Sequence, residues 1–169
     1  MATLKILTYP DTFLKQTAKP VKNIDGAIQK IIDDMAATMY QAPGVGLAAI
    51  QVGCDKSILI YDISPEEEKP SLQVLINPKI VSRAGEMLSE NEGCLSVPDF
   101  KADVKRAASI LVEGLDRDGN PSKIEADGLL AVVLQHEIDH LTGTLFIDRI
   151  SPLKRELYKR RIKKLLRKK

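Results

Sequence analysis

The sequence GLLAVVLQHEIDHL, which runs from Gly128 to Leu141, decides how this chain folds. Its apolar residues recur at the spacing of a helix, and the stretch from Leu129 to Leu134 is the longest apolar run in the chain. A helix with so much apolar surface has to be buried by the rest of the protein. The sequence therefore predicts a central helix over residues 128–141.

Segments on both sides of this helix predict a mixture of helices and strands. Isoleucine and methionine recur at helical spacing over residues 24–41, and that pattern ends before a Pro-Gly pair. Ser151, followed by a proline, is typical of a helix start, and Asp11 fits the N-cap of a short helix. Strands rich in Ile, Leu and Val are expected at residues 57–63 and 72–76, and further strands at residues 80–87, 102–106 and 110–116.

Length and composition limit the class of protein. The chain has 169 residues, of which 44% are hydrophobic and 28% are charged. These values exclude a disordered, collagen-like or disulfide-dense chain. We expect one domain over residues 1–150 and an appended basic helix over residues 151–169. No apolar stretch approaches the roughly 20 residues that cross a bilayer, and the first 14 residues contain no signal-like apolar run, so we expect a cytoplasmic location or an organelle matrix.

Positive charge is concentrated at the C-terminal end. Residues 154–169 hold ten Lys or Arg and a single acid, Glu156, which gives a net charge of +9, whereas the rest of the chain sums to −7. A dense cationic segment attracts polyanions and releases their counterions on binding. RNA is therefore one candidate partner for the segment from Lys154 to Lys169, and a solvated helix face without a partner is the alternative.

The strongest chemical signal is His136-Glu137-Ile138-Asp139-His140, an H-E-x-x-H motif on the central helix. Two histidines four residues apart lie on one face of a helix, so both imidazoles can reach one cation while Glu137 borders the same site. They are the only two histidines in the chain. A chance match would leave them as surface or capping groups, but burying two histidines and two carboxylates without a purpose is costly. The motif predicts a metal site.

A catalytic divalent metal usually has three protein ligands and one open position. Cys94 is the best candidate for the third ligand, because it lies in EGCLS, residues 92–96, a glycine-containing turn that can present a thiolate to a helix. The alternative is that Cys94 is a small buried hydrophobe, as most free cysteines are. The other cysteine, Cys54, is expected to be structural.

A third segment, GVGLAAIQ at residues 44–51, combines small residues with a neutral amide. Its glycines and alanines let another backbone or an extended ligand approach closely, and Gln51 supplies an amide donor. On this interpretation Val45 and Gly46 bind the substrate. A tight helix-packing seam is the alternative, and it is the commoner role of such residues.

Taken together, these segments resemble the three signature motifs of the peptide deformylases. The motifs GVGLAAIQ at 44–51, EGCLS at 92–96 and QHEIDHLTG at 135–143 stand in family order and at suitable separations. ILTYPDTFLKQTAKPV at residues 6–21 is similar to the N-terminal segment of the family, so the resemblance covers nearly the whole chain. Three motifs in order are far more specific than H-E-x-x-H alone.

The resemblance implies a role for each of six residues. The metal ligands would be Cys94, His136 and His140, the catalytic acid/base would be Glu137, and the oxyanion donors would be Gln51 and the backbone N–H of Leu95.

The resemblance also implies an activity and a fold. The family removes formate from the N-terminal formyl-methionine of newly made polypeptides, using one divalent metal that is usually Fe(II) in the cell, with Ni, Co or Zn able to replace it. The implied fold is α+β, with antiparallel sheets packed around the central motif helix. In bacterial members with a long C-terminal helix, that helix docks near the ribosomal exit tunnel, which makes the ribosome a candidate partner of the basic tail. We expect no DNA or membrane partner.

Helical spacing suggests where the substrate side chain lies. Val132 and Val133 precede His136 by four and three residues and share its helix face. We expect them to form an apolar wall for the methionine side chain, and the alternative is that they only fill the core. Some members of the family have an arginine where this chain has Lys101, which keeps the charge but loses the planar fork, so peptide preferences beyond methionine are left open.

Charged residues near the motifs are candidates for positioning the ligands. Arg106 is expected to pair with Glu92 and hold the Cys94 turn, and Asp139 to orient another group. Surface salt bridges are the alternative in both cases.

Two other functions compete with a deformylase. A metallopeptidase would share the helix motif, but a cysteine ligand and the absence of any further histidine argue against the common zinc-peptidase ligand sets. A catalytically idle RNA-binding or ribosome-binding protein would use the cationic tail, but the intact glutamate and ligands argue against it.

Overall fold

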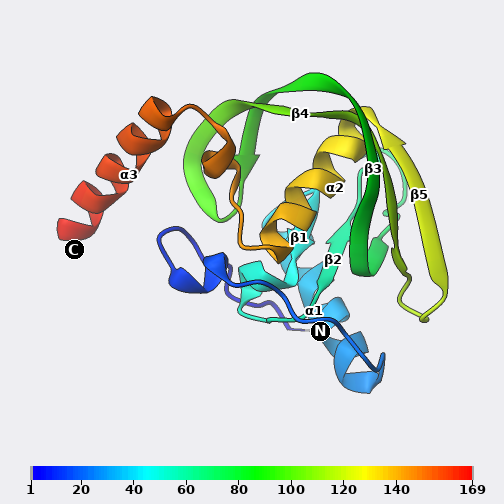
Figure 1. The fold of residues 1–169 in the computed structure, drawn as a ribbon. Helices are drawn as coiled ribbons and strands as arrows, with labels where there is room; N and C mark the ends of the chain where they lie inside the picture. Colours follow the sequence, from blue (N-terminus) through cyan, green and yellow to red (C-terminus); the bar gives the residue numbers. More distant parts are fainter. Residues whose placement is uncertain (1, 169) are drawn as a thin grey trace.

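The computed structural model describes residues 2–168 as an α+β fold (Figure 1). Its three α-helices are α1 (Gly26–Gln41), α2 (Gly128–Leu141) and α3 (Pro152–Arg167). Its strands are β1 (Gly46–Ala48), β2 (Ile58–Tyr61), β3 (Gln73–Cys94), β4 (Val97–Leu115) and β5 (Pro121–Asp127). Short 3-10 helices occupy η1 (Thr12–Lys15), η2 (Ala49–Val52) and η3 (Phe146–Arg149).

The described strands form a single antiparallel sheet in the order β1-β2-β3-β4-β5. The α+β class and the antiparallel pairing are therefore as expected, although the strands join into one sheet rather than several. Register shifts interrupt the β3–β4 ladder, for example between Ile80 and Ser82 and between Ser89 and Glu92. Such irregularities bend and twist a strand pair. The long β3–β4 hairpin accordingly arches over α2 in Figure 1.

Helix α2 lies in the hollow of this curved sheet (Figure 1). Ala131 and Leu134 are completely buried there, in a core cluster that also contains Val104 and Val112 from β4. Burying a leucine side chain fully contributes about 1.5 to 3 kcal/mol. The prediction of a buried central helix over residues 128–141 is confirmed at both ends.

The sequence prediction missed strand β5 and split β3 and β4 into shorter pieces. In β5 only Ala126 is buried, and most of β3 beyond residue 78 is exposed. Pairing with β4 holds both segments in place, so neither needs the apolar side chains that mark a buried strand. For β5 the pairing runs from Ser109↔Asp127 to Leu115↔Pro121. Pairing between distant segments leaves little trace in local composition.

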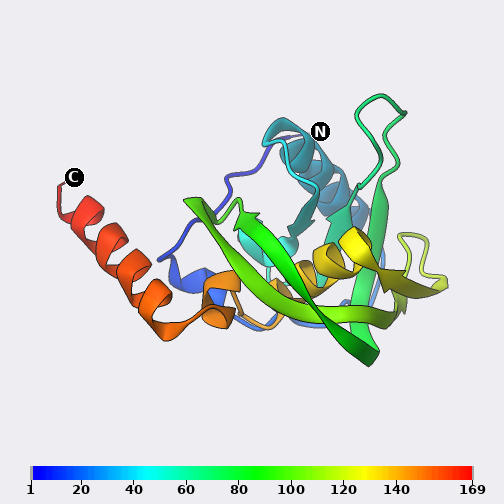
Figure 2. The same cartoon turned by 90° about the horizontal axis from the view of Figure 1, so that it is seen from above.

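Helix α3 begins where predicted and extends away from the rest of the molecule in both views (Figures 1 and 2). Ser151 is its N-cap, with the side chain accepting a hydrogen bond from Lys154 N, and Pro152 occupies the first helical position. Tyr158 is the buried residue of α3, packed 4.6 Å from the Phe100 ring. Of the basic tail from Lys154 to Lys169, Lys169 lies outside the described residues.

Over residues 2–168, none of the helices combines enough length with enough apolar character to span a bilayer.

Candidate metal centre

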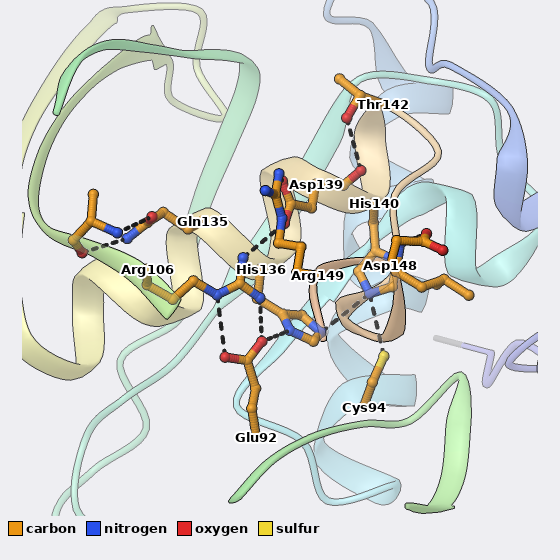
Figure 3. Close-up of polar contacts among 12 residues, drawn as sticks. Glu92, Cys94, Arg106, Gln135, His136, Asp139, His140, Thr142, Asp148 and Arg149 are labelled. Atoms are coloured by element: carbon orange, nitrogen blue, oxygen red, sulfur yellow. Dashed lines mark hydrogen bonds and ion pairs between the residues drawn. The ribbon is translucent and has the colours of Figure 1, made fainter. Parts of the chain in front are cut away.

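Helix α2 brings the two histidines together at the centre of the fold. His136 and His140 are buried on one face of the helix, and their Nε2 atoms lie 3.3 Å apart. The helix is pinned to the sheet one residue earlier, because the Gln135 amide both donates to and accepts from the backbone of Ala107 in β4. This contact fixes the rotation of α2 and so the direction in which its histidines point (Figure 3).

The β3–β4 hairpin supplies the third side chain. Cys94 is the last residue of β3 and pairs with Val97 across the turn. Its Sγ atom lies 3.3 Å from His140 Nε2, and the N–H of Ser96 points at the same sulfur from 3.4 Å. The glycine-containing turn thus presents the cysteine to the helix, as the sequence predicted.

These three side chains could hold one metal ion. Their ligand atoms, Sγ of Cys94 and a ring nitrogen of each histidine, all lie within 4.8 Å of one another. His136 Nδ1 lies 2.7 Å from Glu92 Oε1, so the proton of a neutral His136 belongs on Nδ1 and its Nε2 lone pair faces His140 and Cys94. Atoms of this kind at 3.3 Å need either a shared proton or a metal cation between them. One thiolate and two imidazoles suit Fe, Co, Ni or Zn.

A carboxylate orients His136 from behind. Glu92 is buried and contacts His136 on one side and Arg106 on the other (Figure 3). Burial alone would raise the pKa of Glu92, but the hydrogen bonds from His136 and Arg106 and the guanidinium charge bring it down to about 2. Glu92 is therefore ionised at neutral pH and fixes the ring of His136 by accepting from Nδ1.

The predicted pairing of Arg106 with Glu92 is present, and it continues beyond the prediction. Arg106 Nη1 also donates to Asp139 Oδ2 at 2.8 Å. The same Asp139 carboxylate receives Arg149 from η3, with Nε and Nη2 at 2.6 and 2.7 Å from Oδ2 and Oδ1. Asp139 thus orients two arginines. The sequence prediction missed Arg149, since no local motif links it to the histidine helix.

Glu137 is buried beside the three ligand candidates and has a free oxygen. Over residues 2–168 its Oε2 has no hydrogen-bond partner. Burial raises the pKa of Glu137 to about 7, with the Glu92 charge adding to the rise and His136 opposing it. A buried carboxyl group without a partner is costly in a structural role. It is suited to hold and release a proton.

Gly46 lies against this carboxyl group. A β-carbon built at Gly46 would stand 2.8 Å from Glu137 Oε1. The motif predicts that Gly46 binds the substrate, and Gly46 does line a cleft, but the absence of a side chain also makes room for Glu137. That second role could not be read from the motif because the two residues are 91 positions apart.

Gln51 and Leu95 flank the cysteine. The side-chain oxygen of Gln51, Oε1, accepts from Ala48 N at 2.9 Å, which fixes the amide, and Nε2 lies 3.0 Å from Ser96 Oγ and 3.6 Å from Cys94 Sγ. The Leu95 side chain packs against Gly44, where an added β-carbon would come within 2.9 Å of it. Both residues therefore lie at the cysteine side of the cluster.

A cleft of about 480 Å³ opens onto this cluster. The described residues that line it include all four predicted for substrate binding, together with Gln51, Cys94, Leu95, His136 and Glu137; the four are Val45, Gly46, Val132 and Val133. Leu129 and Lys101 also line it. Val45 and Leu129 are 52% and 59% exposed, so apolar surface remains open at the cleft. Cys54 lies apart from the cleft, against the apolar cluster around α1, as expected for a structural cysteine.

Known proteins of one family are similar to this chain along nearly its whole length. Residues 3–156 match the sequence profile described as polypeptide deformylase. A peptide deformylase of Desulfosudis oleivorans is 58% identical over 167 residues, which is 99% of this chain and 96% of that protein. A peptide deformylase of Thermodesulfovibrio yellowstonii is 55% identical over 163 residues, covering 96% of this chain and 98% of that one.

Solved structures agree with the sequence comparison. The crystal structure of a peptide deformylase from Legionella pneumophila superposes with a TM-score of 0.90 at 48% identity, covering 98% of this chain and 96% of that one. The peptide deformylase from Ehrlichia chaffeensis in complex with actinonin has a TM-score of 0.90 at 42% identity, covering 97% and 98% of the two chains. The sequence match, the fold and the cluster of Cys94, His136 and His140 agree, and the chain belongs to the polypeptide deformylase family.

Proposed function

We propose that this enzyme removes the formyl group from the N-terminal formyl-methionine of newly made polypeptides and releases formate. The observation that carries the proposal is the convergence of Cys94, His136 and His140 beside the buried Glu137, at a cleft with open apolar surface. In this proposal those three side chains hold one divalent metal. Membership of the deformylase family supports the reaction class.

Hydrolysis of a formamide needs a nucleophile at neutral pH, stabilisation of an oxyanion, and a proton for the leaving amine. A divalent metal held by Cys94, His136 and His140 would make a water molecule nucleophilic at neutral pH by lowering its pKa, and would polarise the formyl oxygen. Glu137 takes a proton from the attacking water and later delivers it to the amine nitrogen. Its position next to His136, with Oε2 unpartnered among the described residues, leaves an oxygen free for both transfers.

The oxyanion is stabilised by two donors on the cysteine side. The Gln51 amide, fixed through Ala48, presents Nε2 close to Cys94, and the backbone N–H of Leu95 follows Cys94 directly. Loss of one donor of this kind in another hydrolase costs about 2.7 to 4 kcal/mol in the barrier. Preorganisation matters here, because an amide fixed by its carbonyl needs no reorientation as charge develops.

The methionine side chain occupies the apolar part of the cleft. Val132 and Val133 present the face of α2 that also carries His136, and Val45 and Gly46, at the start of β1, line the same cleft. Methionine fills irregular apolar space well because its unbranched thioether is flexible and polarisable. Peptide residues beyond methionine would pass Lys101, which lines the same cleft.

Iron(II) is the metal we propose in the cell, with Ni, Co or Zn occupying the site in purified protein. A ligand set of one thiolate and two imidazoles is compatible with each of them, and cellular availability decides among them as much as affinity does.

We further infer that α3 docks on the ribosome near the exit tunnel, in the cytoplasm or an organelle matrix. The support is the charge of residues 154–168, which hold nine Lys or Arg, on a helix that extends away from the body. A cationic face of this kind suits ribosomal RNA.

The decisive experiment measures formate release from a formyl-methionyl tripeptide by protein purified anaerobically with Fe(II). The same peptide without its formyl group is the control, because a metallopeptidase would cleave it. Rapid formate release without peptide cleavage is the expected result. Peptide cleavage, or no formate despite stoichiometric metal, would contradict the proposal. A full-length variant with the exposed tail residues Lys154, Lys163 and Lys164 changed to Gln keeps Tyr158 in the core and should release formate at the parent rate, whereas a catalytically idle RNA-binding protein would release none in either form.

A further inference from the structure

Asp139 joins two arginines from different parts of the chain. Arg149 approaches it with two parallel hydrogen bonds, Nε to Oδ2 at 2.6 Å and Nη2 to Oδ1 at 2.7 Å. Arg106 donates to the same Oδ2 at 2.8 Å. A two-pronged arginine–carboxylate contact fixes direction as well as distance. The plane of the Asp139 carboxylate is therefore set by Arg149.

The contacts continue inward to His136. The side chain of Arg106 is only 2% exposed and divides its donors between Asp139 and Glu92, and Glu92 in turn accepts from His136 Nδ1. Arg149, with a side chain that is 44% exposed, is the outer end of a continuous series of charged contacts that reaches a ligand candidate (Figure 3).

The charges along this series balance. Two carboxylates, Glu92 and Asp139, alternate with two guanidiniums. Without Arg149, Arg106 alone would face two carboxylates that are 6% and 14% exposed. An uncompensated carboxylate of low exposure draws the remaining cation towards itself. Arg106 would then shift towards Asp139 and loosen its hold on Glu92, which would alter the contact of Glu92 with His136.

Arg149 is also presented from a rigid turn. It is the last residue of η3, and that turn is closed by Asp148, whose side chain accepts from Leu145 N at 2.9 Å. The backbone carbonyl of Asp139 accepts from Thr142 N and Thr144 N, which fixes the chain that leaves α2. Hydrogen bonds that do not involve the ligand candidates therefore hold the backbone at both ends of the Arg149–Asp139 contact.

We propose that Arg149 is a positioning residue for the metal centre, acting through Asp139, Arg106 and Glu92 to fix the orientation of His136. This inference rests on the proposed function, because it requires His136 to bind a metal. An isolated surface ion pair contributes little to a protein. The Arg149 contact differs because its carboxylate partner is shared with a buried guanidinium that touches the histidine's own partner.

The test uses the full chain loaded with Co(II), whose visible absorption bands report on ligand geometry. Arg149→Gln should shift these bands and speed the loss of cobalt to a chelator. Removing a group that directly contacts a metal ligand typically lowers metal affinity 10- to 100-fold. Arg149 is further from the ligand, so we expect the affinity for cobalt to fall by about 3- to 10-fold. Arg149→Lys keeps the charge but loses the two-pronged contact, so its cobalt spectrum and release rate should lie between those of the parent protein and of Arg149→Gln.

Arg117→Gln is the matched control. Arg117, like Arg149, is a partly exposed arginine that pairs with an aspartate: its Nη2 lies 3.0 Å from Asp33, its Nε lies 3.0 Å from Gln29, and its side chain is 36% exposed. The Arg117→Gln substitution removes one arginine charge, as Arg149→Gln does, at a site that does not contact Asp139, Arg106 or Glu92. Its cobalt spectrum and release rate should equal those of the parent protein.

A double-mutant cycle with Asp139→Asn tests the route. If Arg149 acts through Asp139, adding Arg149→Gln to Asp139→Asn should change the release rate no further. Unchanged spectrum and release in Arg149→Gln, or additive effects in the cycle, would overturn the inference while leaving the proposed function intact. Failure of the parent protein to bind cobalt at all would overturn both.

Discussion

Gly46 and Glu137 occupy adjoining space at the cleft: a β-carbon on residue 46 would lie 2.8 Å from Glu137 Oε1 and 3.0 Å from its Cγ. Strand β1 and helix α2 therefore approach each other as closely as a glycine allows. The carboxyl group that we propose as the acid/base is positioned by the shape of its neighbour as well as by its own helix.

Gly46→Ala should displace the Glu137 carboxyl group and lower turnover while leaving the three ligand candidates in place. A displacement of about 1 Å in a reacting group can cost about 100-fold in rate, and we expect a loss of that order in kcat. Formate release and bound metal measured on the same sample would check it. Gly26→Ala is the control, because nothing lies within 4 Å of a β-carbon there. Equal kcat in the two variants would show that Glu137 is not so constrained.

Glu137→Gln should keep the metal and lose activity. The amide has nearly the shape of the carboxyl group but cannot carry the proton between water and amine. General acid–base catalysis contributes about 100- to 10,000-fold, so kcat should fall by that factor at unchanged metal content. The metal content is measured by elemental analysis beside the formate assay. Near-normal activity with metal bound would contradict the mechanism.

Gly143→Ala should destabilise the protein strongly. Gly143 has a φ of +76°, and a β-carbon there would collide with the carbonyl oxygen of Lys15. Left-handed strain costs about 1 to 2 kcal/mol and overpacking about 1 to 3 kcal/mol, so the free energy of unfolding should fall by about 2 to 5 kcal/mol.

Gly128→Ala separates the two causes, because it introduces left-handed backbone strain without a collision. Its φ is +55°, with nothing within 4 Å of the added carbon, so a loss of about 1 to 2 kcal/mol is expected. Urea unfolding of both variants measures the difference. If Gly143→Ala proved no worse than Gly128→Ala, the contact with Lys15 would not be tight in solution.

Asp62 should make stability depend on pH in the acid range. Burial alone would raise its pKa, but hydrogen bonds from the Ser64 hydroxyl, the Tyr40 hydroxyl and the backbone N–H groups of Ser64 and Ser71 lower it from 3.8 to about 2. A pKa that is lower in the folded state adds stability above the unfolded value, and this stability is lost as the pH falls from about 4 towards 2.

Asp62→Asn removes this contribution. The variant should be less stable than the parent by about 2 kcal/mol at pH 7, the size expected for hydrogen bonds to a charged group. The difference should shrink as the pH is lowered through 4. Urea unfolding at pH 7, 5 and 3 checks the trend, and a difference that stayed constant with pH would show that the Asp62 charge is not responsible.

The sequence was sufficient to predict those elements whose ends and faces are encoded locally. Helix α1 begins at the Asp25 cap, α3 begins at the Ser151 cap, and the apolar run of α2 requires burial, so these helices lie where the pattern indicated. The proximity of Cys94 to the histidines was also predictable, because three motifs in the order of one family are a far more specific signal than H-E-x-x-H alone.

Relationships between distant residues could not be predicted in the same way. Gly46 next to Glu137, Gln135 on the backbone of Ala107, and Arg149 on Asp139 each depend on how the hairpin curves over α2. Strand β5 forms by pairing rather than by its own apolar content. Long-range packing decides these features, and single-residue patterns carry no record of it.

The separation of the ligand candidates along the chain has a consequence for biosynthesis. Cys94 and His140 are 46 residues apart, and the sulfur meets the imidazole only after α2 has docked beneath the β3–β4 hairpin. A chain of this kind has no preformed site in its unfolded state, so metal capture is coupled to tertiary folding. The enzyme would therefore acquire its metal late, once the chain through His140 has left its own ribosome.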